Sequence, residues 1–282
     1  MFGNIIWSLS RFPTGLPRRD SMTGWFWCHN DVTGHKMWNR QPFETCQRRF
    51  VNDWLEPGMT VLDIGANQGL YTLMASRKCG PSGRVIAFEP CRVERLKLRW
   101  NLAWNGCKNV TIQCKAVGRA PASDLVFYAV VGAETGGNSL RPPAADLATA
   151  TKQEKVGMTS VDVFCEASGI DRVHFVKLDV EGGELDVLHG SHHLLSNLPR
   201  PVMLLEVSDV RTAPWGYAAR EVVSYLADLG YTFFEIGDSL LIPHIIQQTY
   251  HKDLLVVPAE SVKELTQKMK SRGWSVLALD KN

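Results

Sequence analysis

Polar side chains stand at the ends of several short apolar runs in this chain. The first run, at residues 60–65, leads into a turn that contains Gly65 and Gly69, and a helical pattern follows. Two glycines let the backbone pass close to a ligand, and the N–H groups at the start of the following helix can point at it. The run at residues 84–89 ends in Glu89, the position that binds ribose hydroxyls in βαβ nucleotide sites. Together these segments predict a nucleotide-binding half-site.

The kind of nucleotide depends on the residues of the turn. A dinucleotide site uses the pattern G-x-G-x-x-G, whereas Asn67 occupies the second glycine position and would keep a pyrophosphate away from the backbone. Asp63 lies in the strand just before the turn, where a carboxylate suits a ligand that carries an ammonium and a sulfonium group rather than phosphates. In the alternative interpretation, Asp63 only caps the turn and Glu89 is an exposed strand end.

A second set of charged residues could carry out acid–base chemistry. Lys177 and Asp179 alternate with apolar residues, so a strand would put both on one side, and buried charges are costly unless they are paired or used. Glu206 ends the next expected strand and should lie beside Asp179. Asp179 or Glu181 could serve as a general base, or the carboxylates could bind Mg²⁺. The structural alternative is an ion pair of Lys177 with Asp179 or Glu206. Glu184 is expected to compensate a helix dipole.

Strand and helix patterns alternate along most of the chain, which is typical of a parallel sheet with helices on both faces. We therefore expect a doubly wound α/β fold with seven core strands. The expected strands cover residues 60–65, 84–89, 110–116, 173–179, 201–207, 231–236 and 252–257, and the expected helices cover residues 44–55, 69–79, 91–105, 183–196, 217–229 and 258–272.

The motifs taken together resemble one family. Three runs, Asp63-Ile64-Gly65-Ala66-Asn67-Gln68-Gly69, Phe88-Glu89-Pro90 and Lys177-Leu178-Asp179-Val180-Glu181-Gly182, resemble those of the FkbM family of S-adenosylmethionine-dependent methyltransferases. Further matches are Asn105-Gly106, Ala116-Val117-Gly118, Asn138-Ser139-Leu140, the helix from Glu184 to Gly190, and Leu205-Glu206-Val207. The resemblance covers residues from roughly 40 to 235.

This resemblance implies a Rossmann-like class I methyltransferase fold with S-adenosylmethionine as cofactor. It also implies methyl transfer to a hydroxyl of a sugar, a glycan or a polyketide-type small molecule. The residues expected at the donor site are Asp63, Gly65, Ala66, Asn67, Gly69, Tyr71, Glu89, Pro90, Ala116, Val117 and Asp179. The residues expected to carry catalysis are Asp179, Glu181, Glu206 and Lys177. No residue is assigned as a metal ligand, and a role for Mg²⁺ is left open.

Two segments interrupt the alternation of strands and helices. Residues 119–171, approximately, form a small β insert between the third and fourth core strands, with strand candidates at 125–130 and 157–164. Residues 1–39 form an N-terminal arm and an aromatic cap. Its Trp25, Trp27 and Trp38 are candidates for lining the acceptor pocket, although such a stripe is more often core. Residues 40–258 are expected to form the methyltransferase domain, and 259–282 a C-terminal helix and tail.

Composition narrows the classes of function. A net charge of +2 and a hydrophobic share of 45% indicate a globular protein without a strong electrostatic preference for nucleic acid. The seven cysteines include no C-x-x-C pair, which favours a reducing cytoplasm over a disulfide framework or a zinc site. His189, His192 and His193 share a helix and are expected to form a polar face rather than a zinc site.

The apolar run at residues 1–9 is too short for a transmembrane helix, so no stable membrane insertion is expected. A weak interfacial contact aided by Arg11, Arg18 and Arg19 is the alternative. The oligomeric state is left open.

Rival functions are a non-catalytic module that binds S-adenosylmethionine for regulation or scaffolding, and a dehydrogenase, which Asn67 disfavours. A nucleic-acid methyltransferase is disfavoured because no N-P-P-Y-like tetrapeptide and no basic stripe are present.

Overall fold

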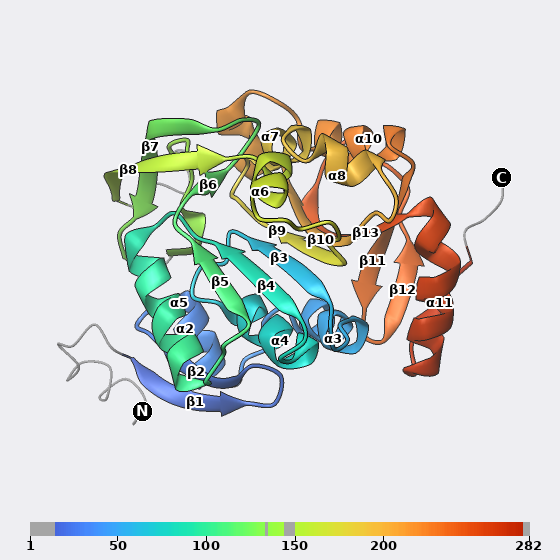
Figure 1. Cartoon of the computed structure of the whole chain (residues 1–282), viewed down its shortest axis with the longest axis horizontal. Coiled ribbons are helices and arrows are strands. Elements are labelled where there is room, and N and C mark those ends of the chain that lie inside the picture. The colour runs from blue at the N-terminus through green and yellow to red at the C-terminus, as the bar shows by residue number, and fades with distance from the viewer. Residues whose placement is uncertain (1–14, 133–134, 144–149, 279–282) are drawn as a thin grey trace.

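The computed structural model describes residues 15–132, 135–143 and 150–278. The proposed arm at residues 1–9 and the last residues of the tail lie outside these ranges. Within them, the chain forms a central sheet with helices on both faces, a two-stranded hairpin and a separate three-stranded sheet (Figure 1). No helix in these ranges combines the length and apolar character needed to cross a bilayer.

The central sheet has the strand order β14-β12-β11-β13-β10-β9-β3-β4-β5. Its strands are β3 (Thr60–Ile64), β4 (Arg84–Phe88), β5 (Val110–Gln113), β9 (Phe175–Leu178), β10 (Val202–Ser208), β11 (Tyr231–Gly237), β12 (Leu240–Pro243), β13 (His251–Pro258) and β14 (Ser275–Val276). The strands β5, β4, β3, β9 and β10 are parallel, and β13 runs antiparallel between β10 and β11. These seven strands are the expected core, and β12 and β14 extend the sheet at one edge.

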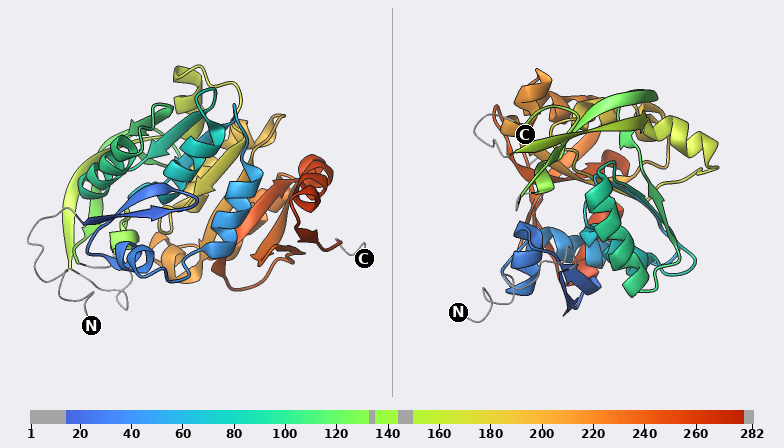
Figure 2. Two further views of the ribbon diagram at one scale, coloured as in Figure 1. Left: turned by 90° about the horizontal axis from the view of Figure 1, so that it is seen from below. Right: turned by 90° about the vertical axis from the view of Figure 1, so that its left-hand side faces the viewer.

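Successive strand residues belong to two different apolar layers, because side chains alternate between the two faces of a sheet. Leu62 packs in the layer under α6 (Val161–Ala167), α7 (Glu184–His189), α8 (His192–Ser196) and α10 (Ala219–Asp228). Val61 packs in the opposite layer under α3 (Thr45–Trp54), α4 (Leu70–Cys79) and α11 (Val262–Ser271). The views in Figures 1 and 2 show these helix groups on the two sides of the sheet. A sheet covered on both faces is what the near-continuous apolar strands predict.

The insert forms its own sheet in the order β6-β8-β7. The strands are β6 (Ala116–Val117), β7 (Ala122–Val130) and β8 (Thr151–Thr159). β6 continues the chain after β5, so the strand expected over 110–116 is divided between two sheets. The predicted flap is therefore attached directly to the carboxyl edge of the central sheet.

Two predicted elements have wrong bounds. The strand expected over 157–164 instead covers Thr151–Thr159, and it ends there because the Ser160 side chain accepts a hydrogen bond from the Val163 N–H and starts α6. The single helix expected over 183–196 is two helices, α7 and α8. They separate at Gly190, where a Cβ would lie 2.1 Å from the Gly118 carbonyl oxygen.

The N-terminal cap consists of a hairpin and a short helix. The strands β1 (Leu16–Asp20) and β2 (Gly24–Cys28) pair in antiparallel fashion, and α2 (Val32–Trp38) follows. β2 lies along α5 (Arg92–Trp104), where Asn101 and Asn105 side chains accept hydrogen bonds from backbone N–H groups of Trp27 and Trp25. The predicted cap is thus joined to the main domain through α5.

Candidate functional site

A cavity of about 340 Å³ lies beyond the carboxyl ends of β3, β4, β9 and β10. This is where open α/β sheets bind ligands. The residues expected from the sequence that line it are Asp63, Gly65, Ala66, Asn67, Tyr71, Glu89, Pro90, Ala116, Val117, Lys177, Asp179, Glu181 and Glu206. Gly69 is not among the lining residues. Gly69 is the last residue of the turn. Its φ is +91°, and a Cβ at this position would lie 2.3 Å from Leu98 Cδ1, so both the backbone and the packing require glycine.

The turn after β3 is closed by hydrogen bonds within the protein. The N–H groups of Gly65 and Ala66 donate to the Phe88 carbonyl, and that of Gly69 donates to Ala66. Those of Asn67 and Gln68 donate to the Glu89 and Asn67 side chains. All five donors from Gly65 to Gly69 are therefore used within the protein. The turn itself therefore offers no cradle for phosphate. The N–H groups expected to point at the ligand are those at the start of the following helix α4, which begins at Leu70, and that expectation stays a prediction.

Glu89 is a buried carboxylate rather than an exposed strand end, with 4% of the residue exposed. Its two oxygens accept hydrogen bonds from the backbone N–H groups of Asn67, at 2.8 Å, and Cys91, at 2.7 Å. Burial raises the pKa of Glu89 to about 8, although both N–H groups act in the opposite direction. Each oxygen keeps a lone pair for a ligand hydroxyl.

Asp63 lies below the turn and is 2% exposed. Its Oδ2 accepts a hydrogen bond of 2.5 Å from the Thr72 hydroxyl on α4, and burial raises its pKa to about 6. Asp63 also lies directly across from Lys177 on the neighbouring parallel strand β9. It thus connects the turn, the helix after it and the charged cluster on β9.

Lys177 is the buried cation at the centre of this cluster. Its Nζ lies 3.1 Å from Asp179 Oδ2 and 5.5 Å from the centre of the Tyr71 ring. Burial alone would lower the pKa of Lys177, but the surrounding carboxylates, Asp179 foremost, raise it above its usual value. The ammonium therefore keeps its proton and acts as a fixed positive charge.

Three carboxylates meet beside Lys177, as the strand ends predicted. Asp179, Glu181 and Glu206 can each place one carboxylate oxygen within 4.8 Å of the others. Burial opposes ionisation of Asp179, but Lys177 outweighs it and holds the pKa of Asp179 below its usual value. Burial and the neighbouring Asp179 raise the pKa of Glu206 well above its usual value, and those same causes raise that of Glu181 to about 8. Like charges this close cannot all ionise, so Asp179 carries the charge at neutral pH.

The sequence did not single out Glu44 and Asp253, which complete the cluster. The Tyr71 hydroxyl donates to Glu44 Oε2 at 2.6 Å, and Glu44 lines the cavity. Asp253 lies opposite Glu206 on antiparallel β13, accepts a hydrogen bond from Gln47 and faces the charge of Lys177. Both are far from Lys177 in sequence, and neither belongs to a motif.

Three residues of the cavity lining have left-handed backbones. Glu44, Asn67 and Glu181 have φ angles of 45°, 49° and 57°, and three other described non-glycine residues with positive φ lie away from the cavity. Non-glycine residues rarely adopt this conformation unless the surrounding structure holds them there. The sequence alone did not reveal that these three positions are left-handed.

The segment that carries Glu181 is held from three sides. The Ser139 hydroxyl in the insert donates to the Glu181 carbonyl at 2.9 Å, and the Tyr217 hydroxyl donates to the Gly182 carbonyl. From within, Glu184 Oε1 accepts hydrogen bonds from the N–H groups of Val180 and Gly182, both at 3.1 Å. Glu184 is buried, so it holds this loop together in addition to lying at a helix start.

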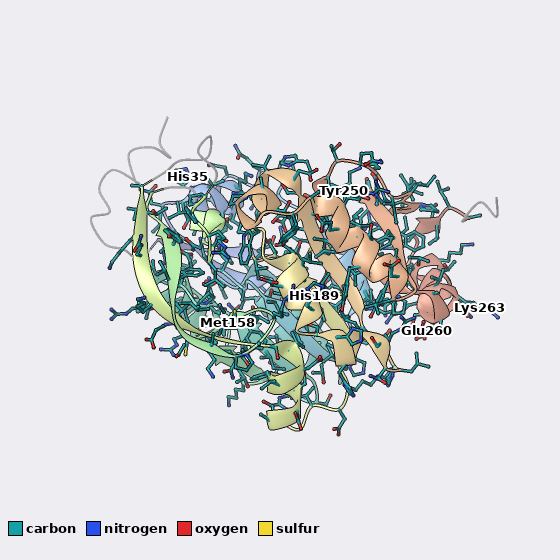
Figure 3. The ribbon with its side chains drawn as sticks, turned by 90° about the horizontal axis from the view of Figure 1, so that it is seen from above. His35, Met158, His189, Tyr250, Glu260 and Lys263 are labelled. Atoms are coloured by element: carbon teal, nitrogen blue, oxygen red, sulfur yellow. The ribbon has the colours of Figure 1, made fainter. Side chains whose placement is uncertain are left out.

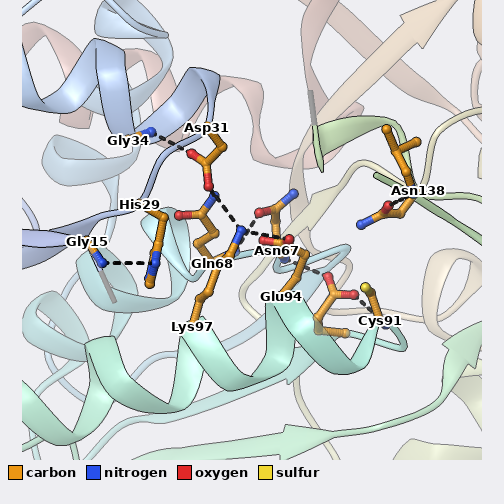
Figure 4. Close-up of polar contacts among 12 residues, drawn as sticks. Gly15, His29, Asp31, Gly34, Asn67, Gln68, Cys91, Glu94, Lys97 and Asn138 are labelled. Carbon is orange, nitrogen blue, oxygen red and sulfur yellow. Dashed lines mark hydrogen bonds and ion pairs between the residues drawn. The ribbon is translucent and has the colours of Figure 1, made fainter. Parts of the chain in front are cut away.

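A polar network connects the cap helix α2 to the turn after β3 (Figure 4). Asp31 caps α2 by accepting from the Gly34 N–H at 2.8 Å, and it also accepts from Gln68 Nε2 at 2.8 Å. Lys97 Nζ joins the network at 3.0 Å from Asp31 and 2.9 Å from Glu94. Because Gln68 belongs to the turn and Lys97 to α5, the network fixes the cap to both elements.

The aromatic residues expected over the site lie elsewhere. Among the described residues of the cap, Val32 and Thr33 line the cavity, and Phe43 lines it just after the cap. Trp25 and Trp27 belong to β2, where the Trp27 ring packs against aromatic residues of α5. Because side chains alternate along β2, the buried Phe26 points toward the main domain and its neighbours Trp25 and Trp27 point the other way. The expectation that Trp25, Trp27 and Trp38 line the pocket is therefore wrong.

The insert lines one part of the cavity. Phe127 and Val130 of β7 and Gly137, Asn138 and Leu140 of the following loop all face the cavity. Met158 on β8, labelled in Figure 3, occupies the position where a Cβ on Gly118 would lie. The His189 ring on α7 packs edge-on against Tyr225, outside the cavity lining, with ring centres 4.8 Å apart.

The sheet order, the antiparallel β13 and a cavity at the carboxyl edge define a Rossmann-like class I methyltransferase fold. Residues 63–233 match the family model described as the methyltransferase FkbM domain. This match covers more than half of the chain, and the protein belongs to the FkbM methyltransferase family.

Several known proteins are similar to this chain. Over 143 residues it is 31% identical to Methyltransferase 1 of Beauveria bassiana. This alignment covers 46% of this chain and 57% of that protein. Over 157 residues it is 29% identical to Methyltransferase sdnD of Sordaria araneosa. This alignment covers 46% of this chain and 59% of that protein. The chain thus aligns with little more than half the length of these curated relatives.

Among solved structures, the chain is similar to Methyltransferase FkbM from Methylobacillus flagellatus KT. The TM-score is 0.46 and the identity is 16%, with 71% of this chain and 43% of that one covered.

Proposed function

We propose that this protein binds S-adenosylmethionine and transfers its methyl group to a hydroxyl of a sugar, a glycan or a polyketide-type small molecule. The observation that carries the proposal is the convergence, in one cavity, of the buried Glu89 carboxylate and the Asp179 cluster. The family match supports the reaction, and the acceptor class rests on the resemblance of the motifs.

The donor side of the cavity suits a cationic nucleoside. The turn has no free N–H group between Gly65 and Gly69 for a phosphate, whereas the Glu89 carboxylate can accept hydrogen bonds from ribose hydroxyls. Asp63 adds negative charge behind the turn once it ionises. This donor set fits S-adenosylmethionine better than a dinucleotide.

The charged cluster suits removal of a proton from the acceptor. A bound sulfonium donor supplies an electrophilic methyl group for in-line displacement. Asp179 is the proposed base because Lys177 keeps it ionised, whereas Glu206 and Glu181 hold protons more tightly. About a third of the Asp179 side chain, 31%, is exposed, so it is open to the cavity. Lys177 then stabilises the charge on Asp179 and fixes its position.

The polar groups of the cavity also suit a hydroxylated acceptor. Six carboxyl groups line it (Glu44, Asp63, Glu89, Asp179, Glu181 and Glu206), with three basic residues (Lys115, Lys177 and Arg211). Because the pKa values of Glu89, Glu181 and Glu206 are raised, these groups hold protons at neutral pH and can both donate and accept hydrogen bonds. A polyhydroxyl compound offers the matching donors and acceptors.

Isothermal titration calorimetry with S-adenosylmethionine, S-adenosylhomocysteine and NAD tests the donor assignment. The first two ligands should bind, and Glu89→Ala should weaken both, whereas exposed Glu264→Ala on α11 serves as the matched control. Binding of NAD with neither sulfur ligand would overturn the assignment.

A screen of hydroxylated acceptors with a labelled methyl donor then tests catalysis. Transfer that depends on Asp179 supports the enzyme. Donor binding without transfer to any acceptor would instead support a regulatory or scaffold module.

A further inference from the structure

Apolar side chains gather on the outer face of α5 and the neighbouring strand β2. Val93, Leu96, Trp100 and Trp104 are exposed and recur along α5 at helical spacing, and Trp25 of β2 is exposed beside them. These five residues, with the half-buried Trp27, form what we call the aromatic face. Trp100 and Trp104 are 53% and 52% exposed, although tryptophan is among the side chains whose burial gains most.

The aromatic face is an ordered surface rather than a set of scattered side chains. The Trp27 ring lies 5.1 Å from that of Trp104, edge to face, and 6.2 Å from that of Trp100. Hydrogen bonds from β2 backbone N–H groups to Asn101 and Asn105 fix the strand against the helix. The views in Figure 2 show α5 and the hairpin side by side at one end of the molecule.

The exposed charged residues of α5 are all basic, and the half-buried Glu154 of β8 adjoins them at Arg92. The exposed residues of α5 are Arg92, Val93, Leu96, Arg99, Trp100, Ala103 and Trp104, and none of them is acidic. Glu94, the acidic residue of α5, is buried and paired with Lys97. On the hairpin, exposed Arg19 lies directly opposite Trp25 in the strand register. Exposed tryptophan and arginine side chains thus lie together on one surface.

We propose that the aromatic face binds the surface of an anionic lipid bilayer. Indole rings prefer the interface between headgroups and acyl chains, and arginine side chains pair with anionic headgroups. A protein partner would gain from the apolar area, but the lack of any acidic residue among the exposed positions of α5 complements a uniformly negative surface best. Contact through one helix face and one hairpin is peripheral and requires no membrane-spanning segment.

Co-sedimentation of the full chain with vesicles tests this proposal. The protein should partition onto vesicles of phosphatidylcholine mixed with phosphatidylglycerol, less onto phosphatidylcholine alone, and less in high salt. Trp100→Ser combined with Trp104→Ser should lower the partition coefficient by about tenfold or more. Arg92→Gln and Arg99→Gln should each lower it about fivefold.

Two controls make the result decisive. Ile245→Ser removes an apolar side chain that is 84% exposed outside this face, and it should leave partitioning unchanged. Circular dichroism checks that each variant is folded. Partitioning that is unaffected by the tryptophan changes, or that depends only on residues 1–12, overturns the proposal. It is also overturned if sedimentation shows a dimer that the tryptophan changes convert to a monomer.

Discussion

The carbonyl oxygen of Asp179 lies 1.7 Å from the position that a Cβ atom would take on Gly65. Gly65 also has a φ of +85°, so both its backbone conformation and its surroundings require glycine. The turn on the donor side and the proposed base are therefore in direct backbone contact. Neither can move without the other.

Gly65→Ala should destabilise the protein by roughly 3 kcal/mol, because backbone atoms rather than a flexible side chain must move. Donor affinity and turnover should fall together. Gly216→Ala is the matched control, since Gly216 also has a positive φ, +83°, in the left-handed region, but no atom lies within 4 Å of its added Cβ. It should cost only about 1 kcal/mol. Urea denaturation measures both, and equal losses would contradict the clash.

Asp179→Asn keeps the shape of the side chain and removes its charge. Turnover should fall by about a hundredfold or more, while donor affinity changes little, if Asp179 is the general base. Single-turnover methyl transfer and calorimetry measure the two effects. Turnover near that of the wild type would return Lys177, Asp179 and Glu206 to a purely structural ion-pair role.

The strain at Glu44 can be measured with two substitutions. Glu44→Ala and Glu44→Gly both remove the hydrogen bond to Tyr71, but only glycine adopts a φ of 45° without cost. Glu44→Gly should therefore be more stable than Glu44→Ala by about 1 kcal/mol. If urea denaturation gives the same free energy for both, the left-handed backbone at this position is not strained.

Glu89 should make stability fall with rising pH. Burial raises its pKa from about 4.5 to about 8, so between these values the folded chain holds a proton that the unfolded chain has lost. The free energy of unfolding must then decrease as pH rises through this window and be unaffected by Glu89 outside it. Glu89→Gln removes this contribution. The stability difference between wild type and variant should shrink toward pH 8, and parallel pH curves would show that the two N–H donors cancel the effect of burial.

A chelator should leave turnover unchanged. Lys177 Nζ lies 3.1 Å from Asp179, and Arg211 Nε lies 2.7 Å from Glu181, so two of the three clustered carboxylates already face a cation. A divalent ion would have to displace or repel these groups. Methyl transfer measured with and without a chelator tests this. Activity that is lost and then restored by Mg²⁺ would support the metal instead.

The parts of the fold that follow from local pattern could be predicted. The strands and helices from Thr60 to Trp104 fall within a residue of their expected bounds, because buried strands and amphipathic helices leave strong periodic signals. The interruption between α7 and α8 could not be predicted, because it follows from close contact of Gly190 with Gly118, far away in the sequence. The short edge strands β12 and β14 have too few residues for a clear pattern.

The candidate site shows the same division. Asp63, Glu89 and Asp179 sit at strand ends that a sequence reveals, and all three line one cavity. Glu44 and Asp253 join them only because α3 and the antiparallel strand β13 pass beside β9 and β10, which is a property of the tertiary structure. The positions of Trp25 and Trp27 were missed for a related reason. A tryptophan-rich segment does not show which neighbour it packs against.

The internally bonded turn from Gly65 to Gly69 has a consequence for competition inside a cell. ATP, ADP and NAD share the adenosine group of the proposed donor and are abundant, so a site that recognised adenosine alone would be blocked by them. Here their phosphates would face turn N–H groups that are already occupied, and the ionised carboxylate of Asp179 lies in the same cavity. Uncharged adenosine analogues escape this rejection, which makes them the natural starting point for selective inhibitors.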